Sequence, residues 1–185
     1  MKSIAKNLLR IKQSIPSNVT LVAVSKTKPI EDLQEAYNAG QRIFGENKIQ
    51  EMVEKYDHLP KDIQWHMIGH LQSNKVKYMA HFVDLIHGVD TLKKLKEINK
   101  QAKKHNRVIK CLLQVKIAEE DTKFGLSFSE VKEILSLAEI SQLHYIKIVG
   151  FMGMATFTDN KIQIQKEFMS LKTFFCHQKL IHTND

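Results

Sequence analysis

Short runs of apolar residues alternate along the chain with longer segments of mixed polarity, and the pattern repeats about every twenty residues. Such runs predict β-strands, and apolar residues that recur at every third or fourth position between them predict helices. The predicted strands are residues 20–26, 42–47, 65–70, 85–90, 108–117 and 146–155. The predicted helices are residues 31–39, 48–56, 74–79, 91–105, 129–138 and 160–176, preceded by an amphipathic helix with Ile4, Leu8, Leu9 and Ile11 or Ile15 on its apolar side.

The alternation of strand and helix predicts an α/β protein whose parallel strands are joined by right-handed crossovers. The first predicted strand agrees with this, since it is apolar on both faces from Leu21 to Val24, as expected of a strand covered by helices on both sides. Two architectures fit six such units: an open doubly wound parallel sheet, or an incomplete (β/α)8 barrel. A complete barrel usually needs about 200 residues or more, so the chain length of 185 residues favours the open sheet. It also predicts a single domain over residues 1–185.

The composition is that of a globular protein, with 43% hydrophobic and 26% charged residues and only seven Gly and three Pro. No apolar stretch is long enough to cross a membrane, and the N-terminus lacks the apolar core of a signal peptide, so we expect a cytoplasmic protein. Cys111 and Cys176 stand alone, which excludes a CxxC metal knuckle and a disulfide framework.

The formal net charge of +8 is concentrated between Lys93 and Lys110, where eight basic residues face one acid, Glu97. Apolar residues recur here at helical spacing, so the lysines should occupy the solvent side of an amphipathic helix. The apolar positions are Leu92, Leu95, Ile98 and Ala102. Because no aromatic residue is interleaved to stack on bases, we interpret this segment as a solvated helix face and keep an RNA contact as the alternative.

In both architectures, ligands bind at the carboxyl ends of the strands. The residues predicted at that end are Lys26, Asn47, His70, Asp90, Glu119 and Met154. No GxGxxG, P-loop or GxSxG motif occurs, which removes the commonest nucleotide-binding and hydrolase interpretations. Gly150 and Gly153 are interpreted as positions that let a helix approach the sixth strand closely.

Lys26 follows the most apolar strand and precedes Pro29, which favours an extended turn. If this lysine is partly withdrawn from water, its amine is harder to protonate and can form an imine with an aldehyde. The alternative is an exposed loop lysine without chemistry.

Asn47 has two interpretations, as an N-cap of the helix that begins near Lys48 and as a ligand contact at the strand end. His66 and His70 stand four residues apart, but on one strand this spacing separates them by roughly 13 Å, too far to share a metal ion. We therefore predict no metal site, and His70 is the better ligand contact of the two.

Four segments together carry a resemblance to a known family. They are LVAVSKTKP (21–29), FGEN (44–47) with Gln50 and Glu51, WHMIGHLQSNK (65–75) and KFG (123–125). In order and spacing they resemble the pyridoxal phosphate homeostasis protein family, which is itself similar to the barrel domain of alanine racemase. The resemblance implies a TIM-barrel-like (β/α)8 fold, in contrast to the open sheet that the length favours.

The same resemblance implies that Lys26 holds pyridoxal 5'-phosphate as a Schiff base and that Asn47 lines the cofactor pocket, with His70 and Met152 nearby. Members of the family are regarded as carriers or regulators of the cofactor, without established catalytic turnover. The implied partners are pyridoxal 5'-phosphate and apo enzymes that depend on it, with neither a membrane nor a nucleic acid. The alternatives are an amino-acid racemase that uses the same cofactor and a basic RNA-associated protein.

Two features limit the resemblance. A racemase needs a second acid or base on the opposite face of the cofactor, usually supplied by a further domain, which argues against an enzyme here. Residues 175–185 show no family pattern, so we expect a truncated barrel without its last two strands. Such a barrel should hold the phosphate weakly, and its first and sixth strands should have open edges that favour self-association.

Overall fold

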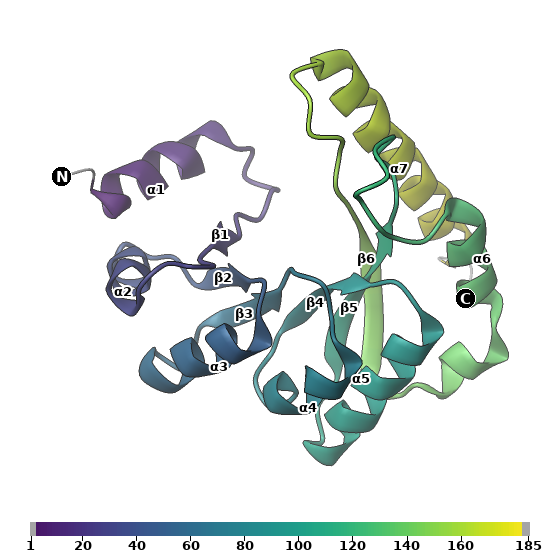
Figure 1. Cartoon of the computed structure of the whole chain (residues 1–185), viewed down its shortest axis with the longest axis horizontal. Helices are drawn as coiled ribbons and strands as arrows, with labels where there is room; N and C mark the ends of the chain where they lie inside the picture. Colours follow the sequence, from purple (N-terminus) through teal and green to yellow (C-terminus); the bar gives the residue numbers. More distant parts are fainter. Residues whose placement is uncertain (1–2, 183–185) are drawn as a thin grey trace. The chain divides into compact units, whose positions relative to one another are not determined.

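The structure is a computed structural model that describes residues 3–182, with side chains to Gln178. The chain divides into two compact units, Met1–Leu85 and Ile86–Asp185. Figure 1 shows the first unit in purple to blue and the second in teal to yellow. The single-domain prediction for residues 1–185 stays a prediction.

The first unit contains three parallel strands that are neighbours in chain order. Its strands are β1 (Ala23–Val24), β2 (Ile43–Glu46) and β3 (Gln64–Met67), and its helices are α1 (Ile4–Ser14), α2 (Ile30–Asn38), α3 (Ile49–His58), the short 3-10 helix η1 (Ser73–Lys75) and α4 (Val76–Met79). Phe44 of β2 and Trp65 of β3 are fully buried with their ring centroids 6.1 Å apart. These rings form the centre of the core of this unit.

The second unit continues with strands that are again neighbours in chain order. Its elements are β4 (Leu85–Val89), α5 (Leu92–Lys104), β5 (Ile109–Val115), α6 (Phe128–Ser136), the 3-10 helix η2 (Ala138–Gln142), β6 (Ile146–Gly153) and α7 (Lys161–His182). β5 and β6 pair in parallel, with a register shift between Cys111 and Leu112. Ser127 and Glu130 form a reciprocal capping box that fixes the start of α6.

The predicted α/β architecture of parallel strands and helices is confirmed. A doubly wound sheet reverses its strand order at a switch point, whereas the strands of each unit follow one another in chain order, as they do in a barrel. Residues 175–182 of the expected non-family tail continue α7, and residues 183–185 lie outside the described part of the chain.

The first strand differs from its prediction. Of the predicted strand 20–26, only Ala23 and Val24 form a ladder with β2, and Val24 is 53% exposed, so the expectation that Leu21 to Val24 are covered on both faces is wrong. The ladder ends because Ser25 begins the turn that leads to α2. In α1, Leu8 is buried but Leu9 is 58% exposed, so the apolar side of this helix is narrower than expected.

The basic helix α5 follows its prediction with one correction. Leu95, Ile98 and Ala102 are fully buried, which confirms the inward-facing stripe. Lys94, expected on the solvent side, is buried instead, and its Nζ lies 2.7 Å from Oδ1 of Asp90. A lysine adjacent to the apolar stripe can be buried when it has an ionic partner one turn away.

Gly153 confirms the predicted close approach of a helix to the sixth strand. A Cβ atom at this position would lie 2.9 Å from Cδ2 of Leu171 in α7. Within residues 3–182, no helix is both long and apolar enough to cross a bilayer.

Candidate functional site

The predicted site residues of the first unit lie where its three parallel strands end. The register pairs Val24 of β1 with Gly45 of β2, and the backbone N–H of Ser25 still donates to the Gly45 carbonyl at 3.0 Å. Lys26 and Asn47 each lie just beyond the carboxyl end of one of these two paired strands.

Lys26 lies outside the strand ladder and is exposed. Within residues 3–178 its ammonium has no hydrogen bond or ion pair. The expectation that this lysine is partly withdrawn from water is wrong, because β1 ends at Val24, two residues before it. What distinguishes Lys26 from other surface lysines is the way its backbone is held.

A buried ionic network lies beneath the turn that carries Lys26. Lys55 of α3 donates to three oxygen atoms, each at 2.7 Å: Oε1 of Glu46, Oε1 of Glu51 and the carbonyl oxygen of Ser25. The side chain of Lys55 is 5% exposed and that of Glu46 is fully buried. An ammonium has three N–H donors, so Lys55 uses all of its hydrogen-bonding capacity in this network.

The same carboxylates also bind the turn directly. The Ser25 hydroxyl donates to Oε1 of Glu46 at 2.6 Å, and the backbone N–H of Thr27 donates to Oε1 of Glu51 at 2.6 Å. The residues on both sides of Lys26 are thus attached to β2 and α3. We refer to Ser25, Glu46, Glu51 and Lys55 as the buried network.

The two carboxylates of the buried network differ in their electrostatics. Burial raises the pKa of Glu46, and the hydrogen bonds from Lys55 and Ser25 offset this only in part. Burial acts in the same direction on Glu51, but there the hydrogen bonds from Lys55 and the Thr27 backbone prevail and lower its pKa. Oε2 of Glu46 is buried and has no hydrogen-bond partner among the described residues.

Asn47 does not cap α3, so that interpretation is wrong. The N-cap residue is Lys48, and no side chain accepts a hydrogen bond there. Asn47 is half-buried, and Gly69, which follows β3, packs directly against its backbone. A Cβ atom on Gly69 would lie 2.4 Å from the Asn47 carbonyl oxygen, which explains why a glycine stands in this motif.

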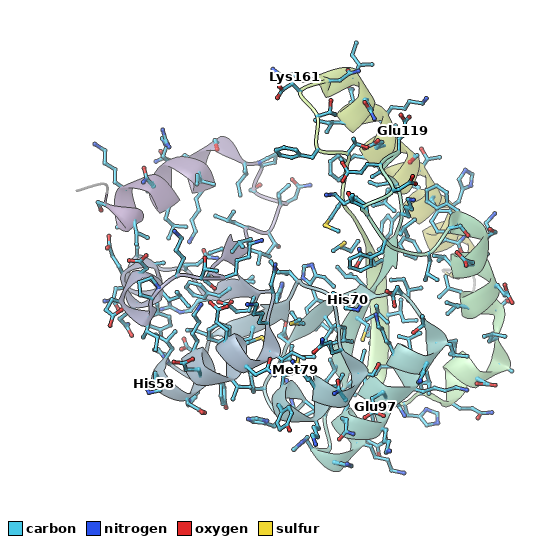
Figure 2. All side chains as sticks on the ribbon, viewed as in Figure 1. His58, His70, Met79, Glu97, Glu119 and Lys161 are labelled. Atoms are coloured by element: carbon cyan, nitrogen blue, oxygen red, sulfur yellow. The ribbon has the colours of Figure 1, made fainter. Side chains whose placement is uncertain are left out.

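The two histidines of the same motif have separate environments. His66 is buried in β3 with Nε2 3.7 Å from Oδ2 of Asp84, and His70 is exposed on the loop after β3 (Figure 2). No group of three metal-ligating side chains occurs in the part of the chain that the structure describes.

The other residues predicted at strand ends lie in the second unit. Asp90 pairs with Lys94, and Met152 and Met154 are half-buried in β6 and just after it. Glu119 follows β5 and accepts a hydrogen bond from Gln163 Nε2 at 3.2 Å, at the end of this unit where Lys161 begins α7 (Figure 2).

Sequence reasoning named Glu46 and Glu51 only as parts of motifs and did not name Lys55. Two signals were available. Glu51 and Lys55 have the i, i+4 spacing of a helical ion pair. Lys55 also continues the buried stripe of Ile49 and Met52 at three-residue spacing, which indicates a lysine that faces the interior.

A family model and a solved structure identify the general class of protein to which this chain belongs. The family model described as the alanine racemase N-terminal domain matches residues 1–181. An alanine racemase from Clostridium difficile 630 superposes with a TM-score of 0.79 at 16% identity, covering 100% of this chain and 48% of the racemase, which is a likeness of fold alone.

More similar proteins narrow the class. The pyridoxal phosphate homeostasis protein of Pasteurella multocida is 36% identical, with 94% of this chain and 79% of that protein covered. The pyridoxal phosphate homeostasis protein of Escherichia coli K12 is 33% identical, with 96% of this chain and 84% of that protein covered. PipY of Synechococcus elongatus PCC7942 without PLP superposes with a TM-score of 0.86 at 35% identity, covering 92% of this chain and 80% of PipY. PipY with PLP bound superposes with a TM-score of 0.84 at 33% identity, covering 94% of this chain and 81% of PipY.

This chain belongs to the alanine racemase N-terminal domain family and, within it, to the pyridoxal phosphate homeostasis proteins. The predicted resemblance and the barrel-like α/β fold are thereby confirmed.

Proposed function

We propose that this protein binds pyridoxal 5'-phosphate and takes part in its homeostasis, with Lys26 as the covalent attachment point and Asn47 as a further contact. The observation that carries the proposal is an exposed, unpaired amine on a turn whose flanking residues are both anchored to buried side chains. The names of the relatives and the PLP-bound PipY support the choice of cofactor.

The residues around the turn fit an anionic aldehyde. Lys26 and Lys48 are exposed cations just beyond the ends of β1 and β2, and they favour the approach of a phosphate group. The nearby carboxylates of Glu46 and Glu51 are both engaged by Lys55, so their charge is partly neutralised.

When bound, the cofactor supplies an aldehyde that condenses with amines and a ring that withdraws electrons. Lys26 would hold the cofactor through its Nζ atom, since an unprotonated amine can condense with an aldehyde and release one molecule of water. Lys55 cannot take this role, because its three donors are occupied in the interior. Asn47, half-buried at the end of β2, offers amide donors and an acceptor to the bound molecule.

We further propose a carrier without catalytic turnover that acts in the cytoplasm and delivers the cofactor to apo enzymes. Solvent exposure of Lys26 supports delivery, because water or a competing amine can reach the same carbon atom. Incubation with L-alanine and the cofactor should form no D-alanine above the background of the free cofactor. D-alanine formation that depends on Lys26 would favour the racemase instead.

The attachment point is tested by reducing the protein with borohydride in the presence of pyridoxal 5'-phosphate and mapping the labelled peptides. We expect the label on Lys26 and the loss of both label and visible cofactor absorbance in Lys26→Ala. Lys28→Ala, which removes an exposed lysine of the same turn, is the matched control and should retain both. Labelling of the wild type without modification of Lys26 would refute the assignment.

A further inference from the structure

We propose that the buried network is a positioning device that selects Lys26, in preference to Lys28, for attachment of the cofactor. The inference rests on the proposed function, because it concerns the same covalent bond. It assigns a role to Ser25, Glu51 and Lys55, which contact the turn without providing the reacting amine.

The turn carries two lysines, so attachment of the cofactor to one of them requires selection. Lys26 and Lys28 are both exposed and stand two residues apart, so exposure does not distinguish their amines. Position does, because a bimolecular condensation is accelerated when the reacting group is held near the bound partner. The backbone N–H of Lys28 is also held, by the Ser25 carbonyl at 3.1 Å, but Lys26 is the lysine that lies between two residues bound by the buried network.

The network fixes the backbone on both sides of Lys26. Before it, the Ser25 carbonyl accepts from Lys55 and the Ser25 hydroxyl donates to Glu46. After it, the Thr27 N–H donates to Glu51. These side-chain bonds are charge-assisted, which makes them shorter and stronger than hydrogen bonds between neutral groups.

Thr27 provides an independent observation. Its φ angle is +62°, in the left-handed region that a β-branched residue rarely adopts. Such a conformation persists only where the surroundings determine it, and here the 2.6 Å bond to Glu51 does so. Together with the 3.1 Å hydrogen bond from the Lys28 N–H to the Ser25 carbonyl, this conformation closes a tight turn over residues 25–28, in which Lys26 and Lys28 occupy different positions.

The burial of the network explains how it can hold the turn firmly. Lys55 and Glu46 are almost inaccessible to water, so water competes little for their hydrogen bonds. Glu46 comes from β2, and Glu51 and Lys55 come from α3. The turn is thus attached to two packed elements and not to another loop.

The experiment measures the ratio of label on Lys26 to label on Lys28 after borohydride trapping with limiting pyridoxal 5'-phosphate. The ratio compares two amines within one molecule, so it does not depend on protein concentration or on the overall yield of labelling. In Glu51→Ala, which removes the acceptor of Thr27 N–H, we expect the ratio to fall roughly tenfold, the effect of losing one charge-assisted hydrogen bond. Glu51→Gln keeps an oxygen acceptor and should restore most of the selectivity.

Glu54→Ala is the matched control, since Glu54 is an exposed glutamate of the same helix; its ratio should equal that of the wild type. Should Glu51→Ala lose its cooperative melting, Ser25→Ala, which deletes one hydroxyl, is measured in the same way, with a smaller fall expected. A wild-type ratio in the folded variant would overturn the inference while leaving Lys26 as the attachment point. Absence of label on Lys26 in the wild type itself would instead overturn the proposed function.

Discussion

The β1–α2 turn of the first unit and the β6–α7 loop of the second are held by the same device, a carboxylate that accepts backbone N–H groups. Thr27 donates to Glu51 at 2.6 Å, and Thr156 donates to Oε2 of Glu167 at 2.8 Å. The carboxylates of the first unit share a buried lysine, whereas Glu167 is surrounded by hydrogen-bond donors without a charge. When one charged residue of a buried ionic network is removed, its partner is left as an uncompensated buried charge, and the protein loses stability.

The largest effect on this comparison is expected from removing the buried cation, Lys55. We expect Lys55→Met to lower the free energy of unfolding by about 3–5 kcal/mol, because Glu46 would remain buried without its partner. Denaturant titration followed by circular dichroism measures the effect. Lys48→Met, at the exposed start of α3, should change stability by no more than about 0.5 kcal/mol. Equal stabilities of the two variants would show that the network contributes nothing to folding.

A smaller effect is expected from the corresponding change in the second unit. Glu167→Ala removes an acceptor from the backbone of Thr156 and Glu119 and from the Thr156 hydroxyl, and should lower the melting temperature by a few degrees. Glu167→Gln keeps an acceptor oxygen and should lie between this variant and the wild type. Glu133→Ala, on the exposed side of α6, is the control and should melt like the wild type. A larger loss in Glu167→Ala than in Lys55→Met would reverse the comparison.

The smallest effect concerns pH and Glu120, which also holds the β6–α7 loop. Hydrogen bonds from Thr122, the backbone N–H of Phe157 and Lys123 lower the pKa of Glu120 to about 2. A carboxyl whose folded pKa is depressed stabilises the fold fully above its ordinary value of 4.5, and this contribution is lost as the pH falls toward 2.

The difference in melting temperature between wild type and Glu120→Gln should therefore be largest above pH 4.5 and shrink below it. NMR titration of the Glu120 side chain checks the pKa directly. A midpoint near 4.5 would contradict the hydrogen bonds that hold the Glu120 carboxylate.

The fold was predictable because burial leaves a periodic signal, and the buried Leu95, Ile98 and Ala102 of α5 illustrate this. The length of β1 was not predictable, since the run from Leu21 to Val24 is apolar whether or not all of it pairs with a neighbouring strand. Lys26 was found through a motif, but its exposure depends on where the ladder ends, which is set by the turn that the Lys28 N–H closes onto the Ser25 carbonyl. Lys55 was missed because a single lysine on a helix is normally assigned to the solvent side, and the partners that stabilise it in the interior, Glu46 and Ser25, come from other segments of the chain.

The buried aromatic pair of the first unit also gives the protein a built-in reporter. Trp65 is the only tryptophan in the sequence, is fully buried and stands next to Phe44 in the core of that unit alone. Fluorescence excited selectively at tryptophan therefore follows the unfolding of the half that carries Lys26, and comparing it with the far-ultraviolet signal of all the helices reveals whether the two halves melt together.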